Sequence, residues 1–249
     1  MFQGFYNLAS GMITQNRNLD VVSNNITNSL TPGYKKDTMT SSTFQEEMIS
    51  RTGNLDKSSP QTLNNIAMIR TATGVVTDYS QGQLEETGNP LDMALTSDGF
   101  FQIQTQNGYV YTRNGSFIID DEGYLALQSV GRVMGTNGAG IYLGTDDISV
   151  DASGNVRLAN GNAAGTIAVV NFDDKTQLDK AENGVFTSNA QPTAYNGTIL
   201  QKSIEQSNVD SVQEMVNMME SQRALQSAAQ VLKIYDDLMN KAVNNIGQV

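Results

Sequence analysis

Hydrophobic residues recur at alternating gaps of three and four positions at both ends of the chain. The N-terminal series is Phe5, Leu8, Met12, Gln15, Leu19, Val22 and Ile26, with one polar member. The C-terminal series is Leu225, Ala228, Leu232, Tyr235, Met239, Ala242 and Ile246, and a shorter run precedes it: Val209, Val212, Val216 and Met219. This spacing is typical of the narrow contact seam of paired helices. We therefore predict a long helix at each end.

Local signals set the limits of these helices. Pro32 disfavours helical geometry in the residue before it and Gly33 favours a turn, so the first helix should end near Asn28. Ser211 with Glu214 has capping-box spacing, and Ser207 with Asp210 has a looser form of it. The second helix is therefore predicted from about Val209 to Asn245.

The middle of the chain is rich in turn signals. Residues 82–197 hold 16 of the 22 glycines. They also hold six Asn-Gly pairs, whose glycines are Gly108, Gly115, Gly138, Gly161, Gly184 and Gly197. Asn-Gly between short apolar runs indicates tight hairpins. The hairpins predicted from such turn signals pair 100–104 with 109–112, 117–120 with 124–127, and 148–150 with 156–158. The apolar run 166–172 predicts a central strand.

The expected fold class is α+β. Terminal helices over 1–34 and 203–249 would pair as a coiled-coil-like stalk, which forms an axial core. The Ser- and Thr-rich residues 35–79 would form an extended connector, and residues 80–202 a central all-β domain, as a sandwich or partly open barrel. Two interpretations of the helices stay open: each packs on its own domain core, or the two pair and stack against copies of the chain. The first 34 residues carry only two charges, Arg17 and Asp20, which favours burial against several neighbours.

Composition restricts the chemistry. The chain of 249 residues has a net charge of −11 and contains no Cys, His or Trp. Nucleophilic Ser-His or Cys-His sites and zinc fingers are therefore excluded, and the acidic balance argues against nucleic acid. No apolar run reaches the roughly 20 residues of a membrane span, and the N-terminal residues do not resemble a cleaved signal.

Two local features of the sequence partly resemble ligand-binding motifs. Gly135, Gly138, Gly140 and Gly144 fail the spacing of a phosphate-binding loop. The acidic runs 120–122 and 146–147 lack the ligand spacing of a calcium loop, so hairpin turns explain them better. We expect no cofactor, no metal site and no enzymatic activity, although paired carboxylates for glycan hydrolysis remain conceivable because their spacing is spatial.

Four segments resemble the flagellar rod and hook protein family. They are SNNITNSLTPGYK at 23–35, SQGQLEETGNPLDMALTSDGFFQI at 80–103, YTRNGSFIIDDEGYL at 111–125, and EQSNVDSVQEMVNMM at 205–219. The motif positions that carry the resemblance are Asn24, Asn25, Asn28, Pro32, Gly33, Gly82, Gly88, Asn89, Pro90, Asp92, Gly99, Phe100, Arg113, Gly115, Ser207, Asn208, Val209 and Asp210. Four motifs in order over nearly the whole chain are far more specific than any one of them.

The resemblance implies a structural subunit of the basal-body rod. Such subunits pass through the flagellar type III export apparatus and assemble with copies of themselves and with other rod and hook proteins. The chain length is similar to rod subunits with one middle domain, of the proximal-rod or distal-rod type, and the start MFQGFYNLASGM favours the distal type. Residues 49–63 lack that type's Gln- and Pro-containing connector, and Leu225 and Gln226 replace its aromatic and acidic residues.

The leading hypothesis is therefore a rod subunit in the basal body, in the periplasm or cell-wall region, which self-assembles into a helical tube and transmits torque. Its expected assembly interface comprises Phe5, Leu8, Met12, Leu19, Val22, Ile26, Val212, Val216, Met219, Leu225, Leu232, Tyr235, Met239 and Ile246. The alternatives are an adhesin-like or regulatory binding module with a helical stalk, and a carboxylate-dependent glycan hydrolase.

Overall fold

The computed structural model describes residues 2–51, 61–106 and 108–246. The chain divides into two units. The helical unit comprises Met1–Thr27, Asp37–Thr77 and Asp210–Val249, and the β unit comprises Asn28–Lys36 and Asp78–Val209. The chain therefore passes between the units after residues 27, 36, 77 and 209.

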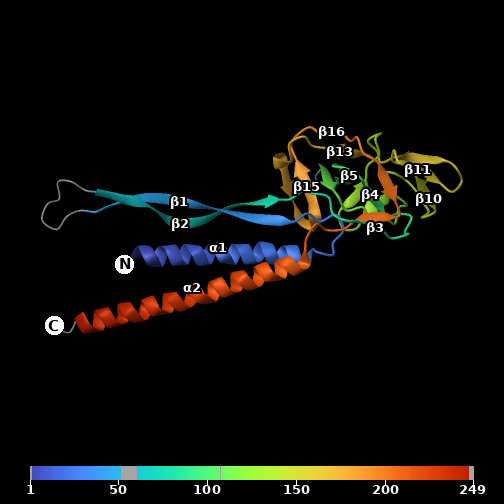
Figure 1. The fold of residues 1–249 in the computed structure, drawn as a ribbon. Helices are drawn as coiled ribbons and strands as arrows, with labels where there is room; N and C mark the ends of the chain where they lie inside the picture. The colour runs from blue at the N-terminus through green and yellow to red at the C-terminus, as the bar shows by residue number, and fades with distance from the viewer. Residues whose placement is uncertain (1, 52–60, 107, 247–249) are drawn as a thin grey trace. The chain divides into compact units, whose positions relative to one another are not determined.

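The helical unit contains two helices and a long hairpin (Figure 1). Helix α1 spans Phe2–Thr27 and helix α2 spans Ser211–Ile246, in agreement with the predicted helices. Strands β1 (Asp37–Arg51) and β2 (Gln61–Thr77) pair antiparallel. Helix α1 lies between this hairpin and α2 and contacts both. The segment expected to be an extended connector is thus mostly a paired hairpin that packs on α1.

The two helices pack antiparallel in a constant register. Asn18 Nδ2 donates to Ser221 Oγ over 2.9 Å, and seven positions further along α1 Asn25 Nδ2 donates to Glu214 Oε2, seven positions back along α2. At Gly4, a Cβ would lie 2.7 Å from Tyr235 Oη. These α1 residues each precede a member of the predicted apolar series by one position. A glycine and two amide side chains of α1 therefore face α2, where the glycine allows close approach and the amides supply hydrogen bonds.

Helix α2 begins after an aspartate cap. The N–H groups of Val212 and Gln213 donate to Asp210 Oδ1 over 3.0 and 3.1 Å. The Ser211–Glu214 capping box is replaced by this simpler cap, because the Glu214 carboxylate accepts hydrogen bonds from Asn25 and Asn217 instead.

The β unit holds sixteen strands among the described residues. They are β3 (Leu84–Glu86), β4 (Met93–Leu95), β5 (Phe100–Thr105), β6 (Gly108–Thr112), β7 (Phe117–Ile119), β8 (Leu125–Leu127), β9 (Gly131–Val133), β10 (Ile148–Val150), β11 (Asn155–Leu158), β12 (Ala163–Thr166), β13 (Val169–Asn171), β14 (Leu178–Lys180), β15 (Val185–Ser188), β16 (Thr193–Ala194), β17 (Ile199–Gln201) and β18 (Ser203–Glu205). Nine of them form one sheet with the path β14-β15-β6-β5-β9-β8-β7, to which β13 and β16 are attached. Smaller sheets are β10-β11-β12, β17-β4 and β18-β3.

The three predicted hairpins are confirmed as β5–β6, β7–β8 and β10–β11. Asn107 in the first turn lies outside the described residues. The prediction of a central strand over 166–172 is wrong. That run is divided between β12, which pairs with β11, and β13, which pairs with β5 and β16. Strand β5 holds the central place instead.

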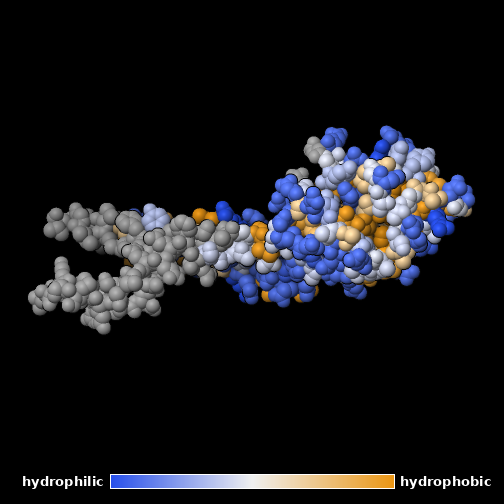
Figure 2. All heavy atoms as spheres, turned by 90° about the horizontal axis from the view of Figure 1, so that it is seen from above, coloured by the Kyte–Doolittle hydropathy of each residue, from blue (hydrophilic) through white to orange (hydrophobic). Residues whose placement is uncertain are grey.

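Strand β5 separates two apolar clusters. Phe101 and Ile103 belong to the larger core, and Phe100 belongs to a second, aromatic cluster with Phe172 and Phe186. Successive side chains of a strand point to opposite faces, so the consecutive Phe100 and Phe101 bury both faces of the sheet. The β-unit surface seen in Figure 2 is mostly hydrophilic, with hydrophobic groups between.

Candidate functional site

The β unit buries a cluster of three charged side chains that are distant in sequence. Lys35 Nζ lies 2.5 Å from Glu205 Oε1, and Arg113 Nη1 lies 2.9 Å from Glu205 Oε2. The side chains of Lys35 and Glu205 are each 1% exposed and that of Arg113 is 2% exposed. Lys35 Nζ also donates to the Ser80 carbonyl, and the Gly82 N–H donates to Glu205 Oε1. The cluster therefore joins four segments of the unit.

Two cations share one buried carboxylate in this cluster. Burial lowers the pKa of the Lys35 ammonium below its ordinary value of 10.5, and the Glu205 carboxylate opposes that shift. Arg113 also faces Asp98 at 3.6 Å and lies over the Phe100 ring at 5.7 Å. Arg113 Nε has no hydrogen-bond partner among the described residues. Such a cluster depends strongly on its carboxylate, because removal of Glu205 takes the ion-pair partner from Lys35 and leaves Arg113 with only its longer contact to the exposed Asp98.

Two glycines of the sequence motifs permit the close approach of these segments. At Gly33, where φ is +69°, a Cβ would lie 2.3 Å from the Arg113 carbonyl carbon. At Gly82 it would lie 1.9 Å from the Gln206 carbonyl oxygen. The Gly33 N–H donates to the Glu205 carbonyl over 2.7 Å. A side chain at either position would displace the facing backbone of Arg113 or Gln206.

The motif at 207–210 organises the end of the β unit. Ser207 Oγ accepts from the Val209 N–H, Val209 is buried, and Asp210 caps α2 in the helical unit. Asn208 Oδ1 accepts from the Lys36 N–H over 2.7 Å, and Asn208 Nδ2 donates to the carbonyls of Asp78 and Ser80.

The Gly-Asn-Pro-Leu-Asp motif forms a hydrogen-bonded loop between β3 and β4. Gly88 adopts a φ of +76°, and its N–H donates to the Lys202 carbonyl. Asn89 Nδ2 donates to Asp92 Oδ1 over 3.0 Å, and the Pro90 carbonyl accepts from Gln201. The loop thus fixes β3 and β4 against the returning strands β17 and β18.

Other motif residues serve close packing. A Cβ at Gly99 would lie 2.5 Å from Tyr195 Cδ2, and one at Gly115 would lie 1.6 Å from the Met93 carbonyl oxygen. Phe100 contacts the rings of Tyr79 and Phe186 edge-on. In the helical unit, Asn25 is buried and Asn24 is exposed on α1.

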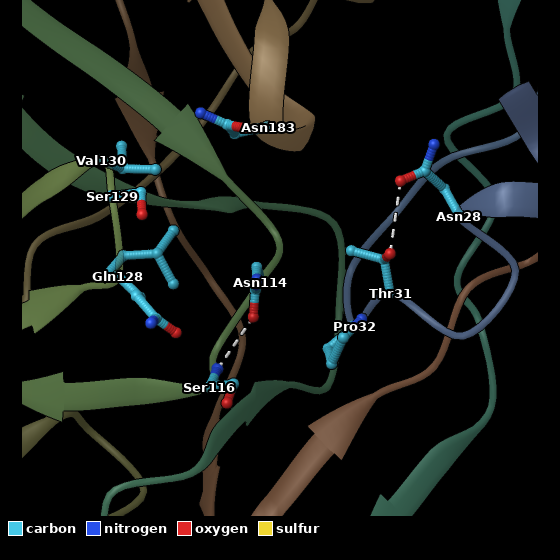
Figure 3. Close-up of a pocket in the computed structure, with 10 residues that line it drawn as sticks. Asn28, Thr31, Pro32, Asn114, Ser116, Gln128, Ser129, Val130 and Asn183 are labelled. Atoms are coloured by element: carbon cyan, nitrogen blue, oxygen red, sulfur yellow. Dashed lines mark hydrogen bonds between the residues drawn. The ribbon is translucent and has the colours of Figure 1, made fainter.

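Asn28 and Pro32 line a cavity of about 390 Å³ on the β unit (Figure 3). Thr31 Oγ1 lies 3.3 Å from Asn28 Oδ1, and the other lining residues are Asn114, Ser116, Leu127, Gln128, Ser129, Val130 and Asn183. The lining contains no charged side chain. The cavity therefore lacks the acids and bases that proton-transfer catalysis needs.

The expected interface residues fall into two groups. Val22 is buried, and Leu8, Met12, Leu19, Ile26, Leu225, Leu232, Tyr235 and Met239 are half-buried. Phe5, Val212, Val216 and Met219 are exposed, with Val212 at 71%. The side chain of Ile246 lies outside the described residues. The seam of α2 is thus partly covered within the chain, whereas the run at 212–219 is uncovered.

The acidic run 120–122 lies in the turn of the β7–β8 hairpin, as expected, whereas 146–147 lie in the loop before β10. Asp120 Oδ1 accepts from the N–H groups of Glu122 and Tyr124, and Asp120 Oδ2 accepts from Arg132 Nε over 2.6 Å. Within the described ranges, no group of three or more acidic residues could hold a metal ion. None of the described helices is long and apolar enough to cross a membrane.

Sequence reasoning missed the charged partners. Lys35 and Glu205 stand inside the quoted motifs, and Lys180, whose Nζ lies 3.8 Å from the Tyr34 ring and donates to the Lys35 carbonyl, lies outside them. The available signal was the scarcity of charge, because charged residues make up only 16% of the chain.

Comparison with known proteins identifies similar sequences along the chain. A family model described as "Flagella basal body rod protein" matches residues 5–35. One for the hook protein FlgE/F/G D1 domain matches 94–158, and one for the rod FlgEFG protein C-terminal region matches 200–246.

Individual relatives match nearly the whole chain. The rod protein FlgG of Bacillus subtilis is 30% identical, with 98% of this chain and 99% of that protein covered. FlgF of Caulobacter vibrioides is 31% identical, with 96% of each covered. The hook-basal body complex protein FlhO of Bacillus subtilis is 29% identical over the full length of both.

Proposed function

Because this chain belongs to the flagellar basal-body rod family, we propose that it polymerises through its terminal helices into a helical tube that transmits torque from motor to hook. It is a structural protein of the basal body rather than an enzyme. Its partners in this proposal are copies of itself, other rod and hook proteins, and the flagellar type III export apparatus.

The uncovered apolar residues of α2 carry this proposal. Val212, Met215, Val216 and Met219 recur at gaps of three, one and three, and all are exposed in the single chain. Val231, Ile234 and Leu238 form a second exposed set further along α2. Exposed contiguous apolar residues favour contact with another protein surface. Repetition of one such head-to-tail contact generates an open helical assembly.

The half-buried seam residues have a different place in this proposal. Leu225 and Leu232 would hold α2 on α1 in a coiled-coil-like pair, and the 212–219 set would contact neighbouring subunits. Close packing of many helices resists twist, which is what transmission of torque requires. Relatives include both FlgG and FlgF, and we favour the distal-rod type because of the start of the sequence.

Substitution on α2 tests the assembly face. Val216→Asp should abolish incorporation into the rod and leave the β unit folded, because it places a charge in the apolar contact. Gln222→Asp, at an exposed polar position of the same helix, is the matched control. Leu232→Asp should also abolish incorporation into the rod, because it would weaken the packing of α2 on α1. Normal rods with Val216→Asp would contradict the proposed face, and a fixed small oligomer of the purified chain would favour the binding-module alternative.

A further inference from the structure

Asn208 forms hydrogen bonds with residues at two other points at which the chain passes between the two units. Asn208 itself lies one residue before Val209, after which the chain passes to the helical unit. Lys36, which precedes the second crossing, donates to Asn208 Oδ1 over 2.7 Å. Asp78, which follows the third crossing, accepts from Asn208 Nδ2 over 2.9 Å. One amide side chain therefore bridges the segments at three of the four crossings.

Direct bonds between the segments reinforce this bridge. The Asp78 N–H donates to the Lys36 carbonyl over 2.8 Å, and Asn208 Nδ2 also lies 3.2 Å from the Ser80 carbonyl. The buried cluster connects the same segments a second time, one residue before Lys36 and three residues before Asn208. Lys35 donates to the Ser80 carbonyl and to Glu205, and the Glu205 carbonyl accepts from the Gly33 N–H.

We propose that Asn208 and the Lys35–Glu205–Arg113 cluster form a clamp that locks the connecting segments 33–36, 78–82 and 205–208 into one mechanical joint. The hydrogen bonds of the clamp link three segments side by side, so a pull on any one segment loads all of these bonds at once. This differs from a hairpin that is pulled open from its end, where the bonds break one after another. The mechanical purpose rests on the proposed function, since only a torque-bearing subunit would need such a joint.

Single-molecule stretching tests the clamp directly. The chain contains no cysteine, so Leu30→Cys and Glu122→Cys provide unique handles at exposed positions of the β unit. Force between them loads segment 31–36 against the sheet. Asn208→Asp keeps the size of the side chain but loses the hydrogen bonds that Nδ2 donates to the Asp78 carbonyl and to the carbonyl and hydroxyl oxygens of Ser80, and it places a carboxylate beside two carbonyls. It should raise the rate of the first rupture at constant force about tenfold or more.

Controls separate the clamp from general stability. Asn196→Ala, at an exposed position of the same unit, should leave the rupture rate unchanged, and Glu205→Gln should raise it as Asn208→Asp does. Equal rupture rates for Asn208→Asp and Asn196→Ala would overturn the clamp. Hydrogen exchange of the unsubstituted chain gives a second test, because the amides of Gly33, Lys36 and Gly82 should open together. Independent exchange of Lys36 would also overturn it.

A cellular experiment distinguishes failure of the clamp from failure of the proposed function. Cells whose rods contain Asn208→Asp should assemble flagella and lose motility in viscous medium at loads that the parent chain tolerates. If those rods resist viscous load as the parent does, the clamp is refuted and the rod function stands. If the parent chain itself never enters the rod, the proposed function fails and the mechanical purpose of the clamp fails with it.

Discussion

Asn25 and Asp37 exchange two backbone-to-side-chain hydrogen bonds. The Asp37 N–H donates to Asn25 Oδ1 over 3.0 Å, and Asn25 Nδ2 donates to the Asp37 carbonyl over 2.8 Å. The same Nδ2 lies 3.2 Å from Glu214 Oε2. Asn25 thus joins the end of α1, the start of β1 and the first turn of α2. It does for the helical unit what Asn208 does for the β unit.

Asn25→Ala should destabilise the helical unit by about 1–3 kcal/mol, because it removes two hydrogen bonds to the Asp37 backbone and one to the buried Glu214 carboxylate. Denaturant unfolding followed by far-ultraviolet circular dichroism measures this change. Asn16→Ala on the exposed side of α1 is the control and should be neutral or slightly stabilising. Equal effects of the two substitutions would show that Asn25 does not connect the elements.

Glu205→Gln should destabilise the β unit by about 3–5 kcal/mol, since it removes the buried carboxylate that forms ion pairs with both buried cations of the cluster. Glu122→Gln is the matched control, because its ion pair with Arg132 is exposed and should contribute less than about 1 kcal/mol. Calorimetry of the full chain compares the two. A small effect of Glu205→Gln would mean that the cluster tolerates a neutral acceptor.

Gly115→Ala should destabilise the β unit by about 1–3 kcal/mol, because the new Cβ would lie 1.6 Å from the Met93 carbonyl oxygen and must displace backbone. Gly11→Ala tests the opposite case. Apart from its own helix and neighbours, nothing described lies within 4 Å of that Cβ, so α1 should gain about 0.5–1 kcal/mol. Thermal unfolding distinguishes the two signs. Loss of rod assembly by Gly11→Ala without loss of stability would place Gly11 at a contact between subunits.

Acid should destabilise the β unit through its turn aspartates. The Lys175 ammonium lowers the pKa of Asp98, the Tyr124 N–H lowers that of Asp120, and the Thr176 hydroxyl lowers that of Asp174, each from an ordinary value of 3.8. The folded chain holds these carboxylates ionised, so their stabilisation is fully present above pH 3.8 and is lost as pH falls through the lower folded values. Unfolding curves between neutral pH and pH 2 measure this loss of stability, and Asp120→Asn should make the stability depend less on pH. If the pH dependence is unchanged by Asp120→Asn, other carboxyl groups cause it.

Local patterns predicted the elements whose signals are local. The limits of α1 and α2 followed from a helical period, Pro32 and the polar residues before α2, and the β5–β6, β7–β8 and β10–β11 hairpins from turns that contain glycine. Gly115 and Gly197 also follow asparagine, yet neither adopts a positive φ. At both positions the missing Cβ serves close packing instead. The same dipeptide therefore has two uses that only its surroundings distinguish.

Two features could be recognised only in the tertiary structure: the hairpin β1–β2 and the division of the run 166–172. Residues 37–51 are Ser- and Thr-rich without an apolar alternation, so no local period marks them as a strand, and their pairing with 61–77 depends on a partner and on α1. In the apolar run, Ile167 enters the larger core and Phe172 the aromatic cluster, which draws the run into two sheets. A continuous apolar run is compatible with either arrangement.

The amino-acid sequence alone was sufficient for the α+β class, the helices at both ends, three hairpins of the β unit and the resemblance to rod proteins, because period, turn chemistry and motif order are properties of neighbouring residues. The partners Lys35 and Glu205 are 170 positions apart, and Asn25 and Glu214 are 189 apart. Only the folded backbone decides which of the few charges meet, because burial of a charge depends on the approach of a distant segment.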